Sequence, residues 1–201
     1  MKEKKKTSLK KNLLEYGIIF AIFGALYLTG LHTEVLGFLQ RGILATGIMN
    51  PDLEKKEDLT SSDPDSKADF NLKLIDSKGK SVAMENFKGK VIFMNVWATW
   101  CPPCVAEMPG INKLYNEVDK EKVAFIMLSV DEDFQKAIDF RERKGFDFEV
   151  YQLNGNLPAL YQTQSIPSTF VIDANGKLVM THLGLGNYDT NKFKEFLKEQ
   201  F

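Results

Sequence analysis

The hydrophobic pattern of this 201-residue chain changes its period several times, and the changes separate an N-terminal head from a C-terminal body. Residues 13–31 form an apolar run whose only charged residue is Glu15. From residue 70 onward, short apolar runs alternate with stretches in which apolar residues recur every three or four positions. The first pattern is typical of a membrane-spanning helix, and the second predicts alternating strands and helices.

The body is predicted to form an α/β sandwich on a mixed sheet. The alternating residues 70–75 predict a strand followed by a turn, and the continuous apolar runs 91–96 and 123–130 predict central strands buried on both faces. Helical spacing predicts helices over residues 102–119 and 187–201, and a third helix that ends near Gly145 and has Asp131 and Asp133 as candidate N-caps. The turn residues 173–176 predict a hairpin of strands 169–172 and 177–183. This order of elements is typical of an α/β fold.

Basic residues precede the apolar run of the head and predict its orientation. Six lysines lie among the first eleven residues, and a 19-residue helix spans about 28 Å, close to the ~30 Å hydrocarbon core of a membrane. We expect a cytoplasmic tail (1–12), a single transmembrane signal anchor (13–31) and a body on the periplasmic, extracytoplasmic side of a bacterial inner membrane. A cleaved signal peptide and a buried soluble helix are the alternatives.

Residues 32–69 are expected to form a membrane-proximal segment and a polar linker, before a domain over 70–201. The apolar stretch 35–49 is broken by Gln40 and Arg41 and suits an amphipathic helix in the membrane interface, and residues 52–69 are polar and charged. The net charge of −1 gives no basic footprint for nucleic acid, and two cysteines are too few for a disulfide-rich scaffold.

The candidate chemistry lies in residues 97–104, which read Trp-Ala-Thr-Trp-Cys-Pro-Pro-Cys and contain both cysteines. They follow a predicted buried strand and open a predicted helix, so Cys101 lies at a helix N-terminus, where a thiolate is favoured. Cys104, one turn further, is expected to stay protonated until it resolves a mixed disulfide. Pro102 and Pro103 are tolerated in the first turn and stiffen it. The spacing predicts dithiol–disulfide exchange.

Residues 91–109, with this motif and Glu107-Met108-Pro109, resemble the TlpA/ResA-like family of membrane-anchored thioredoxins. The resemblance extends from residue 69 to the C-terminus. It implies a thioredoxin fold, with a mixed central sheet flanked by helices and an N-terminal β-hairpin extension. It also implies a thiol–disulfide oxidoreductase without cofactor or metal. Its substrates would be disulfides of exported proteins such as apocytochrome c, and a thiol-relay donor in the membrane would resupply electrons.

The same resemblance implies further site residues. Ile166-Pro167 resembles the cis-proline loop that faces the two sulfurs and offers backbone to an extended substrate. Glu107 is implied to carry a proton, since Asn95 stands where general thioredoxins keep a buried aspartate. Trp97 is expected to pack in the core. The implied substrate-binding residues are Trp100, Pro102, Pro103, Ile166 and Pro167.

Other interpretations of the cysteine pair are open at this level. A zinc site would need further ligands, and His32 and His182 are the remaining histidines. A structural disulfide of this spacing would constrain little chain, and a peroxidase of the peroxiredoxin type would carry Thr where Ala98 stands. Haem attachment is excluded because Val105 follows the second cysteine. The alternative functions are a redox-gated binding or chaperone module, and a general disulfide oxidant or isomerase.

Overall fold

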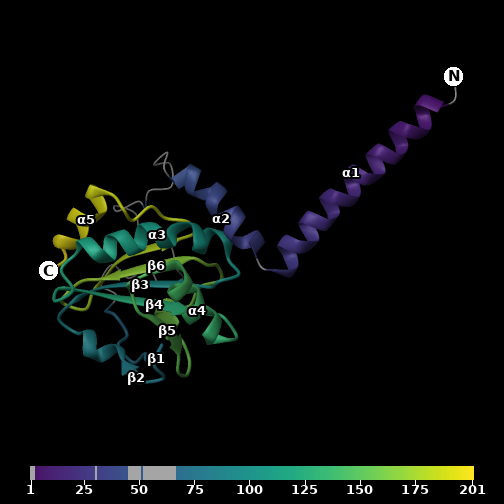
Figure 1. Cartoon of the computed structure of the whole chain (residues 1–201). Coiled ribbons are helices and arrows are strands. Elements are labelled where there is room, and N and C mark those ends of the chain that lie inside the picture. The colour runs from purple at the N-terminus through teal and green to yellow at the C-terminus, as the bar shows by residue number, and fades with distance from the viewer. Residues whose placement is uncertain (1–2, 30, 45–50, 52–66) are drawn as a thin grey trace.

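The computed structural model describes residues 3–29, 31–44, 51 and 67–201. Figure 1 shows a sheet with packed helices, from which the first helix projects. The helices are α1 (Glu3–Leu28), α2 (Leu31–Leu44), α3 (Pro102–Glu117), α4 (Phe134–Lys144) and α5 (Asn191–Lys198), with short 3₁₀ helices η1 (Met84–Phe87) and η2 (Ala159–Tyr161). The strands are β1 (Lys73–Asp76), β2 (Ser81–Ala83), β3 (Val91–Trp97), β4 (Val123–Ser129), β5 (Val150–Leu153), β6 (Ser168–Ile172) and β7 (Leu178–Leu183).

The seven strands form one mixed sheet in the order β2-β1-β5-β4-β3-β6-β7. β3 pairs in parallel with β4, and β4 with β5, whereas the remaining pairs are antiparallel. β3 and β4 are buried along their whole length, which confirms the prediction made from their continuous apolar runs. The β1–β2 pair confirms the N-terminal hairpin. β5 was not predicted, because its four residues show no clear alternation.

Side chains on the two faces of the sheet form two cores. On one face, Phe93 of β3 packs in a cluster with residues of α3, α4 and α5, such as Met108, Phe140 and Phe193. On the other face, the cluster around Met94 is closed by residues from the N-terminal hairpin, η1 and η2. Helices therefore flank the first face of the sheet, as predicted, whereas shorter elements cover the second face.

Local capping explains where the helices begin and end. Asp133 caps α4 by accepting a hydrogen bond from the Gln135 amide at 3.1 Å, and Gly145 ends it with a φ of 66°, in the left-handed region that favours glycine. Asp131, the other candidate cap, binds Thr99 instead. α5 begins later than predicted, because Thr190 is its N-cap.

The head of the chain forms two helices, whose bounds differ from those of the predicted anchor and interfacial helix. α1 continues to Leu28, and α2 begins at Leu31, so the predicted anchor 13–31 is divided between them. None of the helices in the described residues meets the length and apolarity that crossing a membrane requires. The anchor therefore stays a prediction.

The described parts of the membrane-proximal segment and linker contact the body. α2 packs along α3, and residues 45–50 of the predicted interfacial stretch lie outside the described residues. Residues 52–66 of the predicted linker also lie outside them. The last linker residues belong to the body. The Ala68 amide donates to the Gly176 carbonyl at 2.7 Å, and the backbones of Lys67 and Lys177 form an isolated antiparallel β-bridge.

Candidate active site

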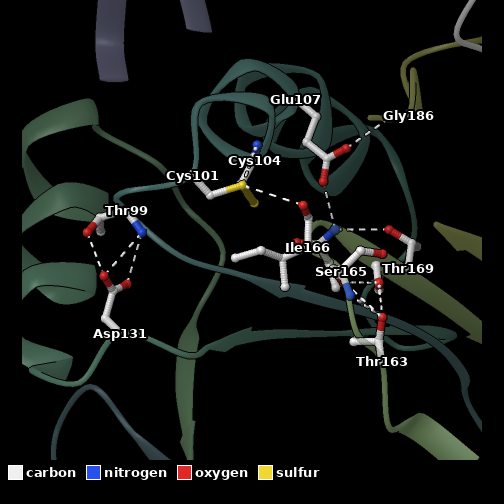
Figure 2. The surroundings of a disulfide bond; sticks show 12 residues. Thr99, Cys101, Cys104, Glu107, Asp131, Thr163, Ser165, Ile166, Thr169 and Gly186 are labelled. Carbon is white, nitrogen blue, oxygen red and sulfur yellow. Dashed lines mark hydrogen bonds between the residues drawn. A yellow bond between two sulfur atoms is a disulfide. The ribbon is translucent and has the colours of Figure 1, made fainter. Parts of the chain in front are cut away.

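The two cysteines form a disulfide at the N-terminus of α3 (Figure 2), with Cα atoms 5.3 Å apart. Cys101 is the N-cap residue, and its Sγ accepts a hydrogen bond from the Cys104 amide at 3.3 Å. Pro102 and Pro103 occupy the first turn, where an absent amide proton breaks no helical hydrogen bond. Cys101 is 4% exposed and Cys104 is fully buried, so Cys101 is the more accessible residue of the pair.

The Ile166–Pro167 peptide bond is cis, as the family resemblance implied, and this loop faces the sulfurs. The Ile166 carbonyl oxygen lies 3.7 Å from Cys101 Sγ. A disulfide sulfur has no proton to donate, so this is a contact here and a possible hydrogen bond only in the dithiol form. The Ser168 hydroxyl donates to the Ser165 carbonyl at 2.7 Å and ties the loop to the start of β6.

Glu107 lies on α3 one turn beyond Cys104, and its side chain is buried. Its Oε1 accepts a hydrogen bond from Asn95 Nδ2 at 2.8 Å, and its Oε2 accepts one from the Gly186 amide at 3.0 Å. Burial raises the pKa of Glu107 to about 8, although the hydrogen bonds from Gly186 and Asn95 act in the opposite direction. This carboxyl therefore exchanges a proton near neutral pH.

Asn95 connects that carboxyl to β6. Its Nδ2 also donates to Thr169 Oγ1 at 2.9 Å, and the Tyr188 hydroxyl donates to the same oxygen at 2.7 Å. Sequence reasoning missed Thr169, Tyr188 and Gly186. A Cβ at Gly186 would lie 2.5 Å from the Tyr188 ring, so the loop needs glycine there. The pairing of Gly186 with Glu107 joins residues 79 apart, so no local pattern reveals it.

The two tryptophans of the motif have different surroundings. Trp97 is fully buried, with its ring 5.6 Å from that of Phe140, as expected for a packing residue. Trp100 is 58% exposed beside Cys101, in a position to contact an incoming chain. Between them, the Thr99 hydroxyl and amide donate to Asp131 at 2.6 and 3.0 Å and hold the loop (Figure 2). Sequence reasoning missed this pair as well.

The surroundings of the cysteines do not favour a metal site. His182 Nε2 lies 3.3 Å from the Leu185 carbonyl oxygen, and its ring packs edge-on against Tyr188. In the part of the chain that the structure describes, no three His, Cys, Asp or Glu residues gather to hold a metal ion. The side chain of His32, the other predicted candidate, lies outside the described residues.

Known proteins are similar to this chain in sequence and in fold. The family model described as Redoxin matches residues 62–197. The thiol-disulfide oxidoreductase ResA of Halalkalibacterium halodurans is 32% identical over 132 residues, covering 65% of this chain and 75% of that protein. The solved thioredoxin domain of a thiol-disulfide oxidoreductase from Bacteroides vulgatus is 25% identical, with a TM-score of 0.58 over 68% of this chain and 99% of that one. StoA from Bacillus subtilis, at 23% identity and a TM-score of 0.54 over 64% of this chain and 98% of its own, supports the fold alone.

Proposed function

The chain belongs to the Redoxin family and is a thiol–disulfide oxidoreductase of the ResA type, and from this premise we propose that it reduces disulfides of exported proteins outside the cytoplasmic membrane. The observation that carries the proposal is the placement of Cys101. Its sulfur lies at the N-terminus of α3, next to the exposed Trp100 and 3.7 Å from the Ile166 carbonyl. A substrate strand lying along the cis-proline loop would bring its own disulfide to that sulfur.

The proposed exchange proceeds in two displacements from the dithiol form. The Cys101 thiolate attacks one sulfur of the substrate disulfide, which forms a mixed disulfide and releases the other substrate sulfur as a thiolate. Cys104 then loses its proton and attacks Cys101 Sγ, which releases the second substrate thiolate and forms the Cys101–Cys104 disulfide. Two electrons pass to the substrate, and a dithiol donor in the membrane returns two electrons to the enzyme.

Glu107 is proposed to accept the proton that Cys104 releases. It lies one helical turn away on α3, and burial raises its pKa to about 8, close to the free thiol value of about 8.5. A base whose pKa lies near that of the donor exchanges protons with it in both directions, and the ionised form of Glu107 that accepts the proton becomes more populated as the pH approaches 8. Asn95 keeps the carboxyl in place by donating to Oε1.

Membrane anchoring is the second part of the proposal, and the surface of α1 supports it. Large apolar side chains are exposed on all sides of this helix, namely Leu13, Leu14, Tyr16, Ile18, Ile19, Phe20, Ile22 and Tyr27. Such a surface is unfavourable in water and suits a lipid environment. With lysines before it, residues 13–31 would place the body outside, where cysteines of exported proteins such as apocytochrome c become oxidised.

Trapping of mixed disulfides tests the reaction and identifies the substrates. In Cys104→Ala the first displacement proceeds and the second does not, so substrates should stay joined to Cys101 in living cells. Cys101→Ala is the matched control and should capture none. Full insulin reduction by the Cys101 variant, with dithiothreitol as donor, would favour a binding or chaperone module over an enzyme.

Protease treatment of intact spheroplasts tests the location separately. The body should be digested from outside, while the lysine-rich tail stays protected. A protected body would contradict the extracytoplasmic assignment without affecting the chemistry of Cys101 and Cys104.

A further inference from the structure

α2 presents two different faces. The buried face carries Thr33, Gly37 and Leu44, whose spacing of four and seven residues places them on one side of a helix. The outer face of α2, defined by Val35, Leu36, Phe38 and Leu39, is 46–70% exposed at each of these side chains. An amphipathic surface helix normally turns polar residues toward water, so this apolar outer face requires an explanation.

The buried face fixes α2 against the active-site helix. A Cβ at Gly37 would lie 3.2 Å from the Pro102 carbonyl oxygen and 3.2 Å from Val105 Cγ1, so the two helices approach closely at the first turn of α3. At the other end, Leu44 packs in a cluster with Ala106. α2 therefore packs directly against the first turn of α3, which carries the cysteine pair.

Ion pairs add to this packing at the start of α2. Glu34 accepts from Lys144 Nζ at 2.7 Å and from the Arg143 guanidinium at 3.1 Å, both on the last turn of α4. The hydrogen bond from Lys144 is the largest effect that lowers the pKa of Glu34. The orientation of α2 on the body is thus set by contacts at both ends, and its outer face points away from the body.

The outer face of α2 follows the exposed apolar surface of α1 closely in the sequence. α2 begins at Leu31, shortly after α1 ends at Leu28, and the two helices run in clearly different directions (Figure 1). If α1 lies across a bilayer, α2 starts at its boundary and runs away from the axis of α1. The Arg41 guanidinium lies 5.9 Å over the Phe38 ring, so a basic group borders the apolar face, as in helices that lie among anionic head groups.

We propose that the outer face of α2 inserts into the membrane interface and holds the redox domain against the bilayer surface, an inference that rests on the anchoring proposed above. The occupant of this face is lipid. Because packed helices lie roughly 8–10 Å apart, the first turn of α3 would then sit about one helix diameter from the head groups. Cys101, at the start of α3, would therefore meet partners that are themselves bound to the membrane.

Photocrosslinking of the full chain tests this inference. A photoreactive phenylalanine analogue replaces Phe38 in one variant, Phe20 of α1 in a second, and Phe201, an exposed residue of the body, in a third. Each chain is reconstituted in vesicles of phosphatidylcholine and phosphatidylglycerol, and insulin reduction verifies that its domain is folded. We expect lipid adducts at positions 38 and 20, and about tenfold fewer at position 201, because only the first two faces are in contact with lipid.

The other outcomes overturn the inference in distinguishable ways. Adducts at position 20 without adducts at position 38 would leave the anchor intact and refute the insertion of α2. Adducts at position 38 that join two protein chains would assign the outer face to a second copy instead of lipid. Absence of lipid adducts at both positions 20 and 38 would refute the anchoring, and the insertion of α2 with it.

Discussion

Substitution of Glu107 by Gln tests the buried carboxyl directly. The variant side chain keeps its length and an oxygen that can accept from Asn95, but it does not ionise. Burial raises the pKa of Glu107 from its ordinary 4.5 to about 8, so between these pH values the folded chain holds a proton that the unfolded chain has released. The stability of the native protein must therefore depend on pH in a way that the variant lacks.

The sign and size of this dependence follow from the two pKa values. The contribution of Glu107 is fully present below about pH 4.5, and it is lost as the pH rises through about 8, where the folded protein carries a buried charge. At about 1.4 kcal/mol for each pH unit, the free energy of unfolding of the native chain falls by roughly 5 kcal/mol relative to the variant between about pH 4.5 and about pH 8.

The substitution also lowers the stability of the variant by an amount that does not depend on pH, which shifts its curve of unfolding free energy against pH relative to that of the native chain. The variant amide nitrogen would face the Gly186 amide, which loses its acceptor at a cost of about 1–3 kcal/mol. The Gln variant is therefore expected to be less stable than the native chain at pH 5 and more stable at pH 9. The crossing of the two curves is the distinctive result, because a general packing defect would lower stability at every pH.

Urea unfolding in mild detergent, with the disulfide intact, measures the two curves between pH 5 and 9. Glu85→Gln is the control, because Glu85 is exposed and its hydrogen bond from Lys88 lowers its pKa, which places its titration below this range. The control should follow the native chain. Parallel curves for the native chain and the Glu107 variant would refute the claim that burial keeps this carboxyl protonated.

Three further substitutions test other parts of the site. Asn95→Asp places a second carboxyl against Glu107, and we expect a loss of about 3 kcal/mol at pH 8 in urea unfolding, with little loss at pH 5 where the pair shares protons. Gly37→Val should loosen α2 by about 1–3 kcal/mol and accelerate hydrogen exchange there, whereas Gly42→Val, which has open space around its Cβ, should not. Trp100→Ala should raise the KM for a protein disulfide while changing stability by less than about 0.5 kcal/mol, because its ring is largely exposed.

Sequence patterns predicted the central part of the fold because its constraints are local. A strand buried on both faces needs a continuous apolar run, so β3 and β4 could be located within a residue or two. The position of Cys101 at a helix N-terminus followed from the strand before it and the helical spacing after it. Ile166–Pro167 was different, because only the family resemblance pointed to its cis bond.

The features that sequence reasoning missed depend on contacts between distant parts of the chain. β5 becomes a strand by pairing with β4, although its own residues show no clear period. The inner face of α2 was not recognised, because Gly37 has meaning only beside α3. The full burial of Glu107 was not predicted for the same reason, since its second hydrogen-bond donor comes from the loop after β7.

The identity of residue 95 determines how many groups titrate in the core around Glu107. Two donors, Asn95 and Gly186, point at the Glu107 carboxyl and favour its ionised form, yet burial is the larger effect and the pKa is still raised. An aspartate at position 95 could not donate when ionised, and two carboxyls would share protons over a wide pH range. An asparagine does not titrate, so a single group carries the proton. That group lies one helical turn from Cys104, where the proposed exchange requires a proton acceptor.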